Sequence, residues 1–258
     1  MVRLVVLLVV TAFTSLPAFA WGKTGHRVVG EIANNYLTED ARKSVEAILG
    51  PEGLAEASTW PDLMRSSPDP FWAKEAGPYH YITVPQGKTY DEVGHPPEGD
   101  AIFALERFKA TLKDPGATLQ ERQLALRFIN HIIGDLHQPL HVGNGTDRGG
   151  NDVTCSFFGD TTNLHAIWDS GLIDQEQLSF TEWTAWLLPT ITETNRDAWS
   201  STDPRVWSAE SAAIRDTVYP AECELSFGYV YDHRETLRLR LSQGGVRLAA
   251  YLNALFAK

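Results

Sequence analysis

The amino-acid sequence predicts a mainly α-helical fold in a single domain. Apolar residues recur at helical spacing in several segments, and loops rich in glycine, proline and aromatic residues separate these segments. Removal of a leader would leave 258 − 20 = 238 residues, which suffices for one domain with a sizeable core. No internal repeat or long linker divides this length. We therefore expect one helical unit from residue 21 to residue 258.

Periodicity and boundary residues predict the elements in order. The expected helices are a first one through Tyr36, then 39–49, 101–112, 118–139, 163–172, 204–219 and a closing stripe at 237–255. Asp203 and Pro204 supply an N-cap and a first-turn proline for the sixth of these. The segments expected without helix are a loop at 58–78, extended residues at 79–84, a glycine-rich loop at 143–152 and a short strand at 153–158.

Residues 1–20 have the composition of a secretory signal peptide. Arg3 precedes an apolar run from Leu4 to about Phe13, and residues 18–20 form a small-x-small cleavage site. This run is too short to serve as an anchor, and no later segment reaches the ~18 apolar residues that a membrane helix needs. We expect a mature domain at 21–258 that is secreted or periplasmic and has no membrane anchor.

The mature chain is acidic and contains two cysteines. Without Arg3 the formal charge goes from −11 to 21 − 33 = −12, which leaves no basic stripe to attract nucleic acid. A polyanionic substrate would need local attraction, for which bound cations are the obvious source, or the acidity serves only solubility. Cys155 and Cys223 are most simply one disulfide, worth ~4 kcal/mol in the chain-entropy model. Metal ligation by these cysteines is disfavoured because neither lies in a Cys-x-x-Cys pattern.

The helix at 118–139 carries the first candidate site. Thr118 and Glu121 form a capping box that begins it. His131 and Asp135 are four residues apart, so their side chains share one face with Cβ atoms ~6 Å apart. A buried imidazole and carboxylate are costly unless they are paired with each other or bound to a metal. A plain hydrogen-bonded pair and a metal site both remain open at this point.

Other residues repeat the pattern. His165 and Asp169 have the same spacing, and His141 lies just beyond the end of the central helix, where the chain can turn back. His80 lies in an aromatic segment, and Asp62 follows a proline. Nitrogen and carboxylate ligands without cysteine suit zinc, and an open coordination position would make such a site catalytic. If these residues converge in space, a shared metal site explains them better than separate buried polar groups that each have their own hydrogen-bond partner.

The chain resembles the trinuclear-zinc single-strand nucleases of fungi and plants (the type I, or S-one/P-one, nuclease family), distant relatives of bacterial zinc-dependent phospholipase C. The resemblance extends from Trp21 to the C-terminal helix and implies the helical fold of that family. The markers are specific only together: Trp21 at the mature N-terminus, Gly25-His26, Trp60-Pro61-Asp62, His80, the spacing of His131, Asp135 and His141, Gly149-Gly150-Asn151, and His165 with Asp169.

This resemblance implies three Zn²⁺ ions. The ligand sets are Asp62, His80, His131 and Asp135 for the first ion, His141, His165 and Asp169 for the second, and the α-amino nitrogen and carbonyl oxygen of Trp21 with His26 and a bridging Asp135 for the third. An uncleaved precursor has an amide in place of the amine of Trp21. We therefore expect its third site to be defective.

The resemblance also implies hydrolysis of RNA, single-stranded DNA and 3′-nucleotides to 5′-phosphorylated products. Asp62 and Asp135 would belong to the catalytic centre, where zinc provides hydroxide near neutral pH and stabilises the departing 3′ oxygen. Arg65 is expected to clamp phosphate, with an ordinary surface arginine as the alternative.

Four further residues are expected at the substrate. Tyr81 matches an aromatic residue that stacks on a base, and Asn151 matches a pocket residue, with a turn asparagine as the alternative. Thr83 stands where fungal members carry a base-reading carboxylate, so base preference is not predicted. Arg148 replaces a smaller residue and could contact phosphate or base.

Two other functions remain open. A phospholipase C would carry a glutamate in place of Asp169 and expose an apolar membrane-contact surface, whereas a zinc-binding protein would bind the metal without turnover. We expect a monomer with no stable protein partner. His137 is expected to pack beside the ligand face, and His95 and His233 are expected in loops or at the surface. Asn144 begins a glycosylation sequon that matters only in a eukaryote.

Overall fold

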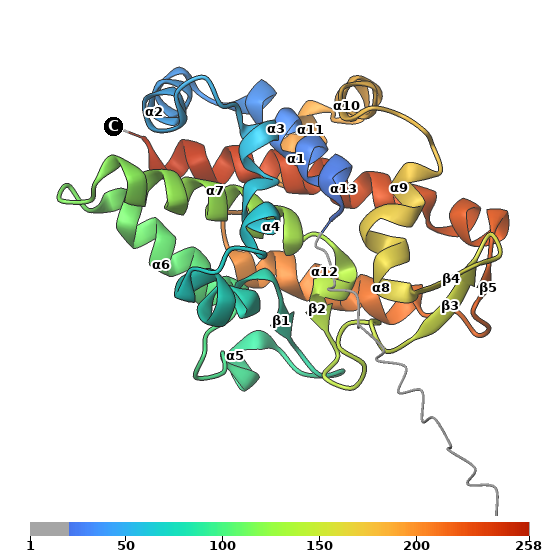
Figure 1. Ribbon diagram of the computed structural model, residues 1–258. Coiled ribbons are helices and arrows are strands. Elements are labelled where there is room, and N and C mark those ends of the chain that lie inside the picture. The colour runs from blue at the N-terminus through green and yellow to red at the C-terminus, as the bar shows by residue number, and fades with distance from the viewer. Residues whose placement is uncertain (1–20, 258) are drawn as a thin grey trace, which may run out of the picture.

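The computed structural model describes residues 21–257, and its fold is mainly α, as predicted (Figure 1). The helical elements, with η for short 3-10 and π turns, are α1 (Lys23–Tyr36), α2 (Glu39–Leu49), α3 (Leu54–Ala57), α4 (Trp60–Met64), η1 (Phe71–Glu75), η2 (Gly77–His80), α5 (Tyr90–Val93), α6 (Ala101–Lys113), α7 (Leu119–Asp135), η3 (Pro139–His141), α8 (Leu164–Ala166), η4 (Ile167–Gly171), α9 (Leu172–Asp174), α10 (Phe180–Leu187), η5 (Leu188–Thr190), α11 (Glu193–Ala198), α12 (Pro204–Val218) and α13 (Phe227–Leu255). Within residues 21–257, no helix is long and apolar enough to cross a bilayer.

Short strands complete the fold at the edge of the helices. They are β1 (Ile82–Thr83), β2 (Val142–Gly143), β3 (Thr154–Phe157), β4 (Asp160–Asn163) and β5 (Glu224–Leu225). β1 and β2 pair in parallel, with Ile82 opposite Val142. β3 pairs antiparallel with β4 and parallel with β5. Cys155 on β3 and Cys223 beside β5 are joined, as predicted, so the disulfide ties the hairpin to the start of α13.

Helices α1, α7 and α13 form the interior. α13 runs across the whole molecule and packs against both of the others (Figure 1). The contact with α1 is close because Gly245 has no side chain: a Cβ there would lie 2.4 Å from the side chain of Ile32. A glycine inside a helix costs ~1 kcal/mol relative to alanine, but here a side chain would separate the two helices. The predicted capping box of Thr118 and Glu121 begins α7.

A buried polar network fixes the C-terminal end of α7. Arg240 of α13 is fully buried, and it donates to the carbonyl oxygen of His137 and to the hydroxyl of Ser211. Arg247 and Arg240 both donate to the carboxylate of Glu210 on α12. Burial lowers the pKa of Arg240 to about 10. Burial also lowers the pKa of His137 far below its usual value, so this packed histidine is neutral.

Replacement of Glu210 by glutamine is expected to lower the free energy of unfolding by about 2 kcal/mol at neutral pH, because two buried guanidinium groups lose their counter-ion. Burial opposes ionisation of Glu210, but Arg247 and Arg240 outweigh it and hold its pKa below 4.5. The stabilisation is therefore present above pH 4.5 and lost as the pH falls through the folded pKa. Urea unfolding at several pH values measures this. Glu46→Gln, at an exposed site, is the control; a difference independent of pH would contradict the prediction.

The structure corrects the predicted loop at 58–78. Within it, α4 begins at Trp60 with Pro61 in its first turn, and η1 and η2 follow. A proline in the first turn costs no hydrogen bond, so the proline-rich composition concealed a helix start. The predicted extended stretch at 79–84 is likewise shorter, because Tyr79 and His80 belong to η2 and only Ile82–Thr83 is a strand.

Three other segments differ from the prediction. The expected helix at 163–172 is divided into α8, the π turn η4 and α9. The last helix begins at Phe227, ahead of the predicted apolar stripe, because its first turns are largely exposed and carry no such stripe. α10 and α11 were not predicted, although Ser179 and Glu182 form a capping box at the start of α10. The predicted strand at 153–158 is confirmed as β3.

Candidate metal centre and its clefts

Imidazoles from four segments surround the carboxylate of Asp135, which is the last residue of α7 and is fully buried. Its oxygens lie 3.3 Å from Nε2 of His26, 3.3 Å from Nδ1 of His80, 3.2 Å from Nε2 of His131 and 3.7 Å from Nδ1 of His141. His26 comes from α1, His80 from η2 and His141 from η3. The helical spacing predicted only the pair within α7.

A second group adjoins the first. Asp169 of the π turn η4 lies 3.5 Å from Nε2 of His141 and 3.2 Å from Nε2 of His165, and the two rings stack at 4.9 Å. The amide of Gln138 donates to Oδ1 of Asp169 at 2.6 Å. Gln138 was not predicted as a site residue. Its only signal in the sequence is its place in the turn between Asp135 and His141.

Asp62 and Trp21 complete the set of predicted metal ligands. Asp62 on α4 lies 3.8 Å from Nε2 of His131. Trp21 is fully buried, and the following backbone nitrogen, that of Gly22, donates to the carbonyl oxygen of Asp169 at 2.6 Å. Side-chain ligand atoms within 4.8 Å of one another fall into three groups: His26, Asp62 and His131; His80, His131 and Asp135; His141, His165 and Asp169.

The donor atoms fit metal ions. Backbone carbonyls accept from Nδ1 of three rings: Ser58 from His131, His80 from His141 and Gly149 from His165. Buried polar atoms are normally paired, and ligand imidazoles usually donate their other N–H to a carbonyl. Among the histidines and aspartates of this cluster, the following buried atoms have no hydrogen-bond partner within residues 21–257: both ring nitrogens of His26, Nε2 of His80, His141 and His165, both oxygens of Asp135, and Oδ2 of Asp169.

Burial and neighbouring charges set the protonation of this cluster. Burial, above all, lowers the pKa of His80 to about 4. Burial also opposes protonation of His141, but Asp135 and Asp169 outweigh it and raise the pKa of His141 to about 9. The surrounding imidazoles likewise overcome burial and hold the pKa of Asp135 well below its usual value. Protons therefore compete with a metal ion for His141.

The glycine-rich loop before β3 supports His165. Gly149 has a φ of +63°, and a Cβ there would lie 2.2 Å from the carbonyl oxygen of Leu140. Only glycine accommodates both conditions without strain. Its carbonyl oxygen holds Nδ1 of His165 at 2.7 Å. In the same loop, the amide of Asn151 donates to the carbonyl oxygen of Arg148.

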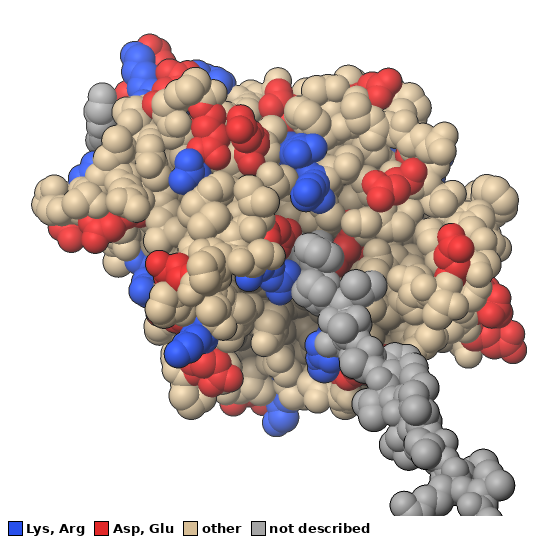
Figure 2. Space-filling view, in the orientation of Figure 1, with Lys and Arg blue, Asp and Glu red and all other residues tan. Residues whose placement is uncertain are grey.

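All five predicted substrate residues line one cavity of about 490 Å³ beside the metal ligands. We call it the Tyr81 cleft. Its lining includes Arg65, Tyr81, Thr83, Arg148 and Asn151 together with the candidate ligands His80, His141 and His165. The side chain of Tyr81 is 47% exposed, so one ring face is available to a ligand. Nη1 of Arg65 lies 3.5 Å from Asp62. The visible face carries mixed acidic and basic side chains and no basic stripe (Figure 2).

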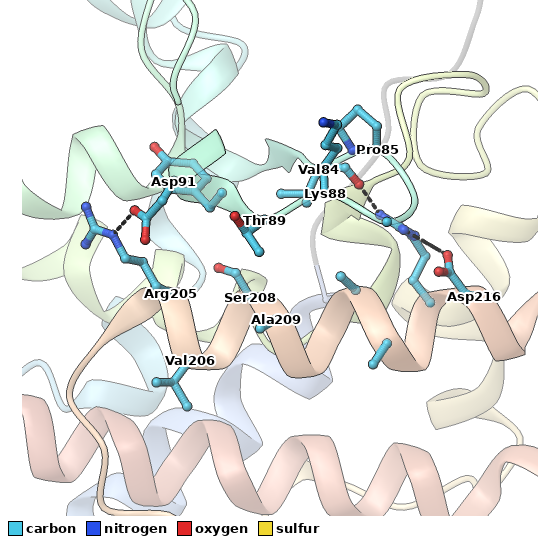
Figure 3. Close-up of a pocket in the computed structure, with 15 residues that line it drawn as sticks. Val84, Pro85, Lys88, Thr89, Asp91, Arg205, Val206, Ser208, Ala209 and Asp216 are labelled. Atoms are coloured by element: carbon cyan, nitrogen blue, oxygen red, sulfur yellow. Dashed lines mark hydrogen bonds and ion pairs between the residues drawn. The ribbon is translucent and has the colours of Figure 1, made fainter. Parts of the chain in front are cut away.

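Another cavity, of about 460 Å³, lies between α12 and residues 84–91 (Figure 3). Arg205 pairs with Asp91 across one end at 2.8 Å. Arg215 lines the same cavity and donates to the carbonyl oxygens of Val84, which follows β1, and Val142 of β2, so it links the two strands. No predicted site residue lines this cavity, so it is separate from the metal centre.

Two remaining histidines lie away from the cluster. His95 is exposed and hydrogen-bonds to the carbonyl oxygen of Pro96, as expected of a loop residue. His233 is half-buried on α13 rather than in a loop, with its ring 4.2 Å from that of Tyr229 and 5.5 Å from that of Trp168. The contact with Tyr229, four residues earlier on the same helix, follows from helical spacing, whereas the contact with Trp168 of η4 depends on the tertiary fold.

Comparison with known proteins agrees with this geometry. The family model for S1/P1 nucleases matches residues 21–257. Endonuclease 2 of Arabidopsis thaliana is 30% identical over 98% of this chain and 97% of its own length. Nuclease S1 of Aspergillus oryzae is 30% identical over 92% of each chain, and nuclease P1 of Penicillium citrinum is 28% identical over 91% of this chain and 97% of its own. The chain belongs to the S1/P1 nuclease family.

Proposed function

We propose that this member of the S1/P1 nuclease family is an exported, monomeric zinc enzyme that hydrolyses phosphodiester bonds in RNA and single-stranded DNA. Its products would be 5′-phosphorylated, and 3′-nucleotides would also be substrates. One observation carries the proposal: unpartnered, buried ligand atoms gather around Asp135 and Asp169 beside a cleft that offers an aromatic ring and arginines. The family is metal-dependent; the metal identity and the count of three ions are part of the proposal.

Three groups of side chains would hold the zinc ions. The proposed sets are Asp62, His80, His131 and Asp135; His141, His165 and Asp169; and His26 and Asp135 with the amino nitrogen and carbonyl oxygen of Trp21. Bound zinc would supply a Lewis acid and a water of lowered pKa as the nucleophile. Asp135 would bridge two of the sets, which is consistent with both of its oxygens lacking a hydrogen-bond partner.

The residues of the chain would bind and orient the substrate. The exposed ring of Tyr81 would stack on a base, which requires an unpaired nucleotide and so favours single strands. Arg65 lies 3.5 Å from Asp62 and lines the Tyr81 cleft, so it would hold the phosphate beside the metal centre. Thr83 and Arg148 border the same cleft and would contact the base or the neighbouring phosphate.

Cleavage after Ala20 would create the amino group that the third set requires. Residues 1–20 lie outside the described part of the chain, so the signal peptide remains an inference from the sequence. The complete burial of Trp21, with Gly22 bonded to Asp169, supports a fixed place for the mature N-terminus beside the metal centre. Zinc analysis should find one ion fewer in a precursor whose cleavage site is blocked.

Metal analysis and product analysis together test the proposal. The mature protein should contain three zinc atoms per chain, digest RNA to products with 5′-phosphate ends, and release no phosphocholine from phosphatidylcholine vesicles. Phosphocholine release without RNA digestion would identify a phospholipase C. Bound zinc with turnover of neither substrate would identify a zinc-binding protein.

Replacement of Arg65 by alanine should lower kcat/KM on single-stranded DNA by about 100-fold, the usual effect of losing one charge-assisted contact to a phosphate in the transition state. Zinc content should not change, because Arg65 is not in any proposed ligand set. Arg196→Ala, which removes the same charge from a surface lining neither cleft nor metal centre, is the control. An unchanged rate would remove Arg65 from the mechanism.

A further inference from the structure

A second cavity adjoins the metal centre, and its outer residues have no assigned role. It has a volume of about 460 Å³, and we call it the Lys23 cleft. Its inner wall contains Asp62 and Asp169, and its outer wall contains Lys23, Thr24, Leu63, Ser66, Ile173 and Asp174. Oδ2 of Asp169 is buried and has no hydrogen-bond partner within the described chain.

Residues on helix α4 and just after it line both this cavity and the Tyr81 cleft. Arg65 at its end lines the Tyr81 cleft, whereas Leu63 and Ser66 line the Lys23 cleft. The residues near the second group of ligands are distributed in the same way: His165 lines the Tyr81 cleft, and Asp169 lines the Lys23 cleft. A phosphodiester held at the centre has one nucleoside on each side of its phosphorus. The two clefts therefore match the two halves of a dinucleotide unit.

The lining of the Lys23 cleft suits a nucleotide. Leu63 and Ile173 offer apolar surface, and Thr24 and Ser66 offer hydroxyls. The side chain of Lys23 is exposed, and among residues 21–257 it belongs to no ion pair, so its charge is available. The first turn of α1, which has no side-chain cap, adds a positive field at the same place. Three carboxylates also line the cleft: Asp62 and Asp169, which are proposed zinc ligands, and Asp174, whose charge opposes a phosphate.

We propose that the Lys23 cleft binds the nucleotide on the 3′ side of the scissile phosphate, with Lys23 on the phosphate that follows. This inference rests on the proposed nuclease function. A 3′-mononucleotide has nothing on that side of its phosphorus and does not enter the cleft. An oligonucleotide does, so the cleft gives the enzyme its preference for a continued strand over a terminal phosphate.

Kinetics of the mature zinc-loaded enzyme on two substrates test the assignment. For a short single-stranded oligodeoxythymidylate, Lys23→Glu should raise KM about tenfold, since an attraction becomes a repulsion. Lys23→Ala should reduce the slope of log kcat/KM against log salt by about 0.7, the value for one phosphate contact to a single strand. Hydrolysis of thymidine 3′-phosphate should be unchanged in both variants. Asp174→Asn should lower KM for the oligonucleotide about twofold.

Lys113→Glu is the matched control, because Lys113 lies at the end of α6 and lines neither cleft. Equal kinetics of Lys23→Glu and wild type on the oligonucleotide would overturn the inference, and so would equal losses on both substrates, which would show an effect on the metal centre. If Lys23→Glu fails to fold, the KM of Asp174→Asn for the oligonucleotide tests the inference by itself, and an unchanged KM would overturn it. Wild-type enzyme inactive on both substrates would instead overturn the proposed function.

Discussion

Asp135→Asn is expected to lower kcat/KM on single-stranded DNA at least ~1000-fold, because it removes an anionic ligand that two proposed metal ions share. Four imidazoles lie within 3.7 Å of the Asp135 carboxylate, so the loss of its charge affects every ring around it. The amide keeps the shape of the side chain, so packing against the end of α7 should persist. Zinc content should fall by two atoms per chain.

Asp135→Ala should give the same loss of activity and also lower the melting temperature, since it leaves a void in a fully buried position. Asp232→Asn, at an exposed position of α13, is the control for the loss of one carboxylate. The measurements are zinc by atomic emission, initial rates and thermal melting. Retained activity with a normal zinc content would overturn the assignment of the metal centre.

Gly149→Ala is expected to reduce kcat/KM about 100-fold and to destabilise the fold by about 3 kcal/mol. Two effects add. A φ of +63° disfavours any residue with a Cβ, and that Cβ would lie 2.2 Å from the backbone oxygen of Leu140, which cannot move as a flexible side chain does. The loop must then shift, and with it the carbonyl that holds Nδ1 of His165.

Gly159→Ala separates these two effects. Gly159 also has a positive φ, of +91°, but nothing lies within 4 Å of a Cβ placed there. It should therefore lose stability through backbone strain alone, with zinc content and turnover unchanged. Denaturant unfolding, zinc analysis and initial rates should distinguish the variants. Equal stability losses in both, with three zinc atoms retained in Gly149→Ala, would refute a role of Gly149 in holding His165.

Short-range patterns predicted much of the scaffold. The capping box of Thr118 and Glu121, the span of α2 and the start of α12 all depend on residues within one or two turns, and the structure confirms them. The same holds for the pairs His131 with Asp135 and His165 with Asp169, because residues four apart on a helix always share a face.

Contacts between residues on separate elements could be predicted only from the family resemblance, or else had to be observed in the fold. His26, His80 and Asp62 lie on separate elements, and nothing in their local sequence indicates that their side chains meet. Gln138 orients Asp169, and the carbonyl oxygens of Ser58 and Gly149 orient His131 and His165. No pattern in the sequence predicts these hydrogen bonds. The helix start at Trp60 was missed because proline is typical of both loops and first turns.

The sequence by itself determined which residues can be ligands and which pairs lie side by side, since chemistry and helical spacing are local properties. Only the tertiary structure decided that α1, α4, η2, η3, α8 and η4 deliver their side chains to the end of α7. Such convergence depends on how helices pack, and packing depends on the shape of the whole core rather than on any one segment. The Tyr81 cleft and the Lys23 cleft arise in the same way, because residues from several separate elements line each of them.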